Sequence, residues 1–217
     1  LKFFFLNVDY VSIFHLVGGE PLLYPHVNEV IDFIGENFRK KIGRLLLTTN
    51  GTIKPKDQTI ELMKKFNLLI SVSDYTKAIK YERKFLQTID TLKSNNISHF
   101  VREDIEWSDF GNPEKVQIDD DKIKEHFKKC TAPYRGLYNG KYFYCHLNTS
   151  AVLSDIIQLN ENDYVDLYKE GLDSNELINL DLGITKLGYL TFCKNCNGCN
   201  TGINIPVSPK SQGLRKS

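Results

Sequence analysis

The sequence predicts an α/β fold, in which a parallel sheet forms part of a (β/α) barrel and a small cysteine-rich module with a β-hairpin follows. Four apolar, strand-like runs recur along the first half of the chain, with segments of helical periodicity between them. Strands that alternate with helices pair in parallel through right-handed crossovers. All five cysteines lie from residue 130 onward. We therefore expect two domains, residues 1–129 and 130–217.

The elements follow from local patterns. Leu1–Leu6 is apolar from the first position and resembles the middle of a helix, so we expect further sequence before it. Each predicted strand is a short apolar run that ends at polar or glycine residues, and each predicted helix carries apolar residues on one face. The expected strands are 12–17, 44–49, 68–73 and 97–102. The expected helices run from Pro25 to Phe38, over 56–66, through Ile79 to Leu92, and onward from Asp119–Asp121. We expect loops at 104–111 and a mobile tail from Pro206.

Polar residues follow each predicted strand. Because parallel strands bring their C-terminal ends to one rim, these residues form a candidate ligand site. Paired glycines let a ligand approach the backbone closely, and Glu20 offers an acceptor for an amine, so the first turn suits a zwitterionic ligand. The candidate residues are Gly18, Gly19, Glu20, Pro21, Thr49, Asn50, Ser71, Ser73 and Arg102. A lone Gly–Gly pair is more often only a tight turn, and ordinary strand-end capping is an equal alternative for the threonine and the serines.

The cysteine spacing points to metal. Cys130 and Cys145 flank Asn139–Gly140, a dipeptide typical of hairpin turns. Three more thiols, Cys193, Cys196 and Cys199, stand two residues apart. Five cysteines in a chain of cytosolic character favour metal over a disulfide framework. Zinc and an iron–sulfur cluster both accept four thiolates, so the count does not choose between them, nor does it say which four bind.

Composition narrows the choice of partners and compartment. The net charge of +1 gives no indication of a nucleic-acid partner or an anionic membrane. No stretch is apolar enough to cross a bilayer, and no signal peptide is visible. A cytoplasmic protein is expected.

The histidines suggest supporting roles. His15 lies inside the first predicted strand, where a core or supporting position is favoured over catalysis. His146 follows Cys145 directly and can act as an outer donor to sulfur.

Two features together resemble a known superfamily. Gly–Gly–Glu–Pro at Gly18–Pro21, directly after an apolar strand, resembles the motif with which radical S-adenosylmethionine (SAM) enzymes hold the amino group of SAM. The spacing of Cys130, Gly140 and Cys145 resembles the opening of the SPASM and twitch modules, which follow the radical SAM domain and bind auxiliary clusters. The later cysteines are fewer and differently spaced than in a full SPASM module, so one auxiliary [4Fe–4S] cluster is expected.

The resemblance implies an oxidoreductase that cleaves SAM reductively to a 5′-deoxyadenosyl radical, which abstracts hydrogen from a peptide or small-molecule substrate. Gly18, Gly19 and Glu20 would hold the amino group, Ser71 or Ser73 would reach ribose or carboxylate, and Arg102 would pair with the carboxylate. Thr49 and Asn50 would line the same rim. An electron donor such as flavodoxin or ferredoxin is implied as a partner.

A second [4Fe–4S] cluster is implied on a three-cysteine loop that should lie before Leu1. This chain alone would then be inactive. The alternative is a non-catalytic α/β binding module with a structural zinc site. A nucleotide-binding enzyme of another type has little support, since neither a P-loop nor a Gly-x-Gly-x-x-Gly fingerprint occurs.

Overall fold

The computed structural model describes residues 1–103, 106–108, 119–131, 134–198 and 204–206. The chain divides into two compact units. The sheet unit comprises Val8–Trp107 with Ile205 and Pro206, and the cysteine unit comprises Leu1–Asn7 and Ser108–Asn204.

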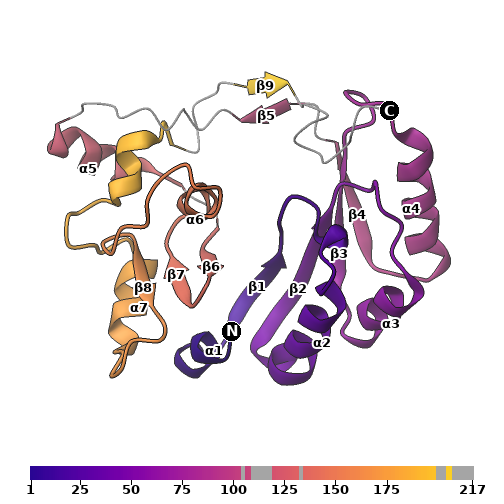
Figure 1. Ribbon diagram of the computed structural model, residues 1–217, viewed down its shortest axis with the longest axis horizontal. Coiled ribbons are helices and arrows are strands. Elements are labelled where there is room, and N and C mark those ends of the chain that lie inside the picture. Colours follow the sequence, from indigo (N-terminus) through magenta and orange to yellow (C-terminus); the bar gives the residue numbers. More distant parts are fainter. Residues whose placement is uncertain (104–105, 109–118, 132–133, 199–203, 207–217) are drawn as a thin grey trace. The chain divides into compact units, whose positions relative to one another are not determined.

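A four-stranded parallel sheet forms the centre of the sheet unit (Figure 1). The strand order β1-β2-β3-β4 follows the chain, so the parallel sheet and α/β class predicted from the sequence are confirmed. The observed ends of the strands lie within two residues of the predicted ones. The strands are β1 (Val11–Leu16), β2 (Ile42–Thr49), β3 (Leu69–Asp74) and β4 (His99–Glu103).

Helices connect these strands and cover one face of the sheet, where Figure 1 shows them together. They are α2 (Val27–Phe38), α3 (Asp57–Lys65) and α4 (Glu82–Ser94), with short 3₁₀ turns η1 (Pro21–Leu23) and η2 (Arg39–Lys41). Alternate residues of β2 explain the layering, because Leu45 and Leu47 are fully buried, as are Ile31 and Ile34 of α2. Burial of such side chains contributes about 1.5–3 kcal/mol each.

The third connecting helix begins later than its apolar pattern predicts. Ile79 lies before α4, in a turn where its N–H donates to the carbonyl of Tyr75. Its side chain is nevertheless buried. An apolar residue in helical register can therefore belong to the core without belonging to the helix.

The cysteine unit has an antiparallel sheet of β6 (Gly136–Tyr138), β7 (Lys141–Phe143) and β8 (Tyr164–Asp166). Asn139 and Gly140 join the first two strands with φ angles of 44° and 73°, which confirms the predicted hairpin turn. The helical elements of the unit are α1 (Lys2–Asn7), α5 (Asp120–Lys129), α6 (His146–Leu153), α7 (Ser174–Asp181) and η3 (Thr191–Asn195). The elements β8, α6 and α7 occupy a stretch for which the sequence indicated no structure.

The unit boundary differs from the one expected at residue 130, because α5 associates with the segment that contains the last cysteines. The hydroxyl of Tyr189 donates to Asp120 at 3.0 Å, and Lys194 pairs with the same carboxylate at 3.1 Å. The first helix also belongs to the cysteine unit, where the rings of Phe4 and Tyr142 stack at 5.7 Å. Contacts between residues far apart in sequence therefore decide that α1 and α5 belong to the cysteine unit.

A further two-stranded sheet pairs β5 (Glu106–Ser108) with β9 (Asn204–Pro206). The first of these strands lies in a stretch that was predicted to be a loop, which is wrong for these three residues because the pairing partner comes from far along the chain. Beyond residue 206 the expected tail lies outside the described residues. None of the helices in the described ranges has the length and apolar content needed to traverse a lipid bilayer.

Candidate functional site

Glu20 organises the first turn after β1. Its side chain is only 8% exposed, and it accepts hydrogen bonds from the N–H of Asn50 at 2.7 Å and the N–H of Leu22 at 3.0 Å. The hydroxyl of Thr49 lies 3.0 Å from both carboxylate oxygens. Burial raises the pKa of Glu20, and these hydrogen bonds oppose the increase. The carboxylate therefore ties the end of β1 to the end of β2.

Thr49 and Asn50 are engaged in the same turn. Thr49 is 1% exposed, and the side chain of Asn50 accepts from the N–H and the hydroxyl of Thr52 at 2.9 and 2.6 Å. This pattern is an Asx turn, which ends the strand and prepares the chain for α3. Both residues thus support the rim from within.

Gly18 and Gly19 lie beside open space. A Cβ at either position would meet no described atom within 4 Å. Pro21 begins η1 directly after Glu20, which caps that turn by accepting from Leu22. A ligand can therefore approach the backbone of the two glycines without displacing a side chain.

A second group of polar residues lies on the sheet face opposite the helices. Residues that are paired across parallel strands share a face, as do residues two apart in one strand. The register pairs His15 with Leu46, Thr48 with Ser71, and Ser73 with Arg102. The polar face is defined by His15, Thr48, Ser71, Ser73 and Arg102.

Hydrogen bonds and charge connect this polar face. His15 Nε2 and Thr48 Oγ1 lie 2.7 Å apart, and Arg102 donates to the hydroxyl of Ser73 at 3.3 Å. Burial lowers the pKa of His15, and the positive charge of Arg102 lowers it further. Arg102 is exposed while both serines are buried, so the guanidinium is the charged group of this face that a ligand can reach. A guanidinium in such a setting suits a carboxylate ligand.

Tyr81 fixes the turn that follows β3. Its hydroxyl accepts from the N–H of Tyr75 at 2.9 Å and donates to the carbonyl of Ser73 at 3.4 Å. Burial raises the pKa of Tyr81 to about 12, so the phenol is neutral at physiological pH. Charges on Asp74 and Glu20 add to the increase.

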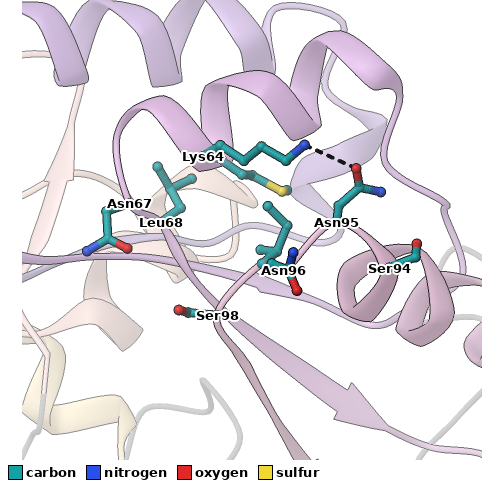
Figure 2. Close-up of a pocket in the computed structure, with 9 residues that line it drawn as sticks. Lys64, Asn67, Leu68, Ser94, Asn95, Asn96 and Ser98 are labelled. Carbon is teal, nitrogen blue, oxygen red and sulfur yellow. Dashed lines mark hydrogen bonds between the residues drawn. The ribbon is translucent and has the colours of Figure 1, made fainter.

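A hollow of about 400 Å³ lies at the other end of the strands. Figure 2 shows its lining, which comes from the turns before β3 and β4 and includes Lys64, Asn67 and Asn96. Lys64 donates to the side chain of Asn95 at 3.2 Å. The N-terminal ends of parallel strands are not where ligand sites of such folds lie, so this hollow is separate from the candidate site.

The four described cysteines occupy the ends of helical elements in the cysteine unit. Cys130 ends α5, Cys145 precedes α6, and Cys193 and Cys196 lie in and directly after η3. Cys145 and Cys193 are buried, the other two are half-buried, and all four are free thiols. Cys199 lies outside the described residues.

The thiols affect one another electrostatically. The pKa of Cys193 is raised to about 12, mainly by burial and in smaller part by charge on Cys145, Cys196 and Cys130. Burial also raises the pKa of Cys145 and of Cys196, with additional contributions from their neighbouring thiols. Because such interactions weaken with distance, the four thiols lie within electrostatic reach of one another.

In the part of the chain that the structure describes, a hydrogen bond to a sulfur and three unpaired polar atoms belong to residues that are close in sequence to these thiols. The N–H of Gly198 donates to the sulfur of Cys196 at 3.3 Å. Among the described residues, the buried polar side-chain atoms that have no partner are His146 Nδ1, Asn148 Oδ1 and Asn195 Oδ1. Each belongs to a residue within three positions of a cysteine. Buried polar atoms without partners are costly, so their concentration here fits a polar or metal ligand.

The donor set suits a metal that takes four sulfurs, either zinc or a [4Fe–4S] cluster. As the side chains stand, no three metal-binding groups in the described part of the chain are close enough to hold one ion. Thiolates bind such a metal at about 2.3 Å, so binding would require the thiols to lie closer together than they do here.

Sequence reasoning gave His15 only a supporting role and did not single out Thr48 or Tyr81. Strand alternation combined with register would have placed His15 and Thr48 on the face of Ser73 and Arg102. The register itself, however, is not visible in the sequence. Tyr81 gave no local signal, because its partners lie at the end of a strand.

No model of a protein family matches this chain, and no curated protein matches it significantly.

Proposed function

We propose that this chain is part of a radical SAM enzyme, with a partial (β/α) barrel and one C-terminal auxiliary [4Fe–4S] cluster. The four free thiols of the cysteine unit carry the proposal, because cysteines from two distant parts of the chain belong to one compact unit and would together supply the four sulfurs that a cluster takes. The Gly18–Pro21 turn after β1 and the polar face of the parallel sheet support it. When bound, SAM and a reduced [4Fe–4S] cluster together supply the 5′-deoxyadenosyl radical that abstracts hydrogen from the substrate.

In the sheet unit, we assign SAM recognition to two groups of residues. The backbone of Gly18 and Gly19 faces open space and would accept from the amino group of the ligand. Arg102 would pair with its carboxylate, and Ser71 and Ser73 would supply hydroxyl groups beside that ion pair.

Glu20 takes a supporting role in this proposal. Its carboxylate already accepts from Leu22, Thr49 and Asn50, so it would hold the glycine turn in place while the backbone contacts the ligand. Thr49 and Asn50 would stabilise the rim in the same way.

In the cysteine unit, Cys130, Cys145, Cys193 and Cys196 would bind the auxiliary cluster. The N–H of Gly198 would donate to a cluster sulfur ligand, as it does to Cys196 here. The protein to test is the full-length gene product.

The proposal is tested on that gene product, purified anaerobically and reconstituted with iron and sulfide. We expect absorption near ~400 nm, which colourless zinc cannot give, and the release of 5′-deoxyadenosine from SAM upon reduction. Arg102→Gln should weaken SAM binding by about 1–3 kcal/mol, the cost of a lost bond to a charged group. Arg44→Gln is the matched control, because Arg44 lies on the same side of the sheet but is not one of the residues that define the polar face.

Protein that binds only zinc and forms no 5′-deoxyadenosine would overturn the proposal. It would favour the alternative, a non-catalytic α/β binding module with a structural zinc site, which the same four thiols also suit.

A further inference from the structure

A single buried carboxylate joins the two cysteine-bearing segments of the cysteine unit. Asp163 lies directly before β8 and is 2% exposed. Its Oδ1 accepts from the N–H of Thr191 at 2.6 Å. Its Oδ2 accepts from the Thr191 hydroxyl at 2.7 Å, from the N–H of Phe192 at 3.0 Å and from the side-chain amide of Asn148 at 3.0 Å.

These donors come from two segments that each bear thiols. Asn148 lies in the first turn of α6, which Cys145 precedes. Thr191 and Phe192 are the first residues of η3, which contains Cys193. Asp163 therefore caps η3 from outside and fixes its start against the start of α6.

The hydrogen bonds to the Asp163 carboxylate depend on its position and could not be made by a side chain of another shape. A buried carboxylate is costly unless donors satisfy it, and here every described donor is neutral. Neutral donors hold the carboxylate only in a defined geometry. Its loss would leave buried N–H groups without acceptors at the start of η3, where helical N–H groups have no internal partner.

We propose that Asp163 is a positioning residue that sets the separation of Cys145 from Cys193 for joint metal binding. The inference rests on the proposed function, which assigns these two thiols to one cluster. Asp163 touches neither thiol in this role; it acts through α6 and η3.

The test measures the proximity of the two thiols without any metal. In a background where Cys130, Cys196 and Cys199 are replaced by serine, dibromobimane becomes fluorescent on the protein only when it alkylates both Cys145 and Cys193. Asp163→Asn removes one carboxylate oxygen and should slow this crosslinking by about tenfold or more, which corresponds to about 1.4 kcal/mol.

Asp173→Asn is the matched control, because Asp173 caps α7 in the same unit by accepting from the N–H of Asn175 and has no bond to a cysteine segment among the described residues. It should leave the crosslinking rate within twofold of the parent. If Asp163→Asn does not fold, Thr191→Val tests the same point by removing only the hydroxyl donor, with Thr191→Ser expected to restore the rate.

Crosslinking of a folded Asp163→Asn or Thr191→Val variant at the parent rate would overturn the inference. The result is independent of iron–sulfur content. Protein that lacks a cluster but shows slowed crosslinking would overturn the proposed function alone, and protein that holds a cluster but shows unchanged crosslinking would overturn only the role of Asp163.

Discussion

His15 on β1 and Arg102 on β4 share one electrostatic environment, although they belong to the opposite edge strands of the four-stranded sheet. Burial of the imidazole lowers the pKa of His15, and the guanidinium charge lowers it further. The register of the four strands places both residues on the same face of the sheet. The positive charge of Arg102 therefore acts on His15 across the width of this face.

This relationship can be measured directly by titration. Arg102→Gln should raise the pKa of His15 toward 6.5, because it removes the positive charge that opposes protonation. The measurement is the pH dependence of the His15 ring signals in NMR, assigned by comparison with His15→Gln. Arg44→Gln, on the same face, should leave the titration unchanged, and an unchanged titration in Arg102→Gln would contradict the coupling.

Glu20→Ala should destabilise the protein itself. The substitution leaves the Thr49 hydroxyl and the N–H of Asn50 buried without their acceptor, at a cost of about 1–3 kcal/mol. Urea unfolding provides the measurement. Glu29→Ala is the control, because Glu29 is exposed and pairs with the exposed His26, so its loss should cost about 0.5 kcal/mol or less. Equal effects of the two substitutions would show that Glu20 is not a structural centre of the rim.

The pH dependence of stability should carry a signature of Glu20. Burial raises the pKa of Glu20 in the folded state above its ordinary value of 4.5. At a pH between 4.5 and the folded-state pKa, the folded chain therefore binds more protons than the unfolded chain. The contribution of Glu20 to stability is therefore fully present below pH 4.5 and is lost as the pH rises through the folded pKa. Glu20→Gln should lack this loss. Parallel stability curves for wild type and Glu20→Gln from acid to neutral pH would contradict the raised pKa.

The hairpin turn should be sensitive to a methyl group at Gly140. A Cβ there would overlap the ring of Tyr168, and the backbone has a φ angle of 73° that disfavours side chains. Gly171 has a similar φ of 67°, but a methyl group at that position would meet no described atom within 4 Å, so Gly171→Ala isolates the backbone cost, about 1–2 kcal/mol. Thermal unfolding should show Gly140→Ala to be the more destabilised of the two. A reversed order would mean that Tyr168 moves aside freely.

Removal of individual thiols should separate cluster ligands from the remaining cysteine. Serine replacement of Cys130, Cys145, Cys193 or Cys196 should lower the iron content and the absorption near ~400 nm of anaerobically reconstituted protein, because a cluster takes four thiolates. The same replacement at Cys199, which lies outside the described residues, tells whether the fifth cysteine belongs to the ligand set. Loss of iron in Cys199→Ser with retention in one of the others would reassign the ligand set.

Local patterns were sufficient for much of the fold. The parallel sheet followed from apolar runs separated by helical periods, and the hairpin followed from Asn139–Gly140, whose positive φ angles few other dipeptides adopt. These features depend on residues close together in sequence. The candidate residues after the strands were likewise recognisable from their position alone.

Tertiary structure decided which of those residues point into the protein and which are accessible. The sequence alone does not show whether the carboxylate of Glu20 points to solvent or to the end of β2. The packing of the strands places it next to the Thr49 hydroxyl. The partner of Asp163 at Thr191 is 28 positions away, and no local pattern indicates a bond over that separation. Side-chain orientation and long-range hydrogen bonds depend on strand register and on which segments meet, so the sequence determined the elements of this protein and their polar ends, whereas the fold determined how those ends act together.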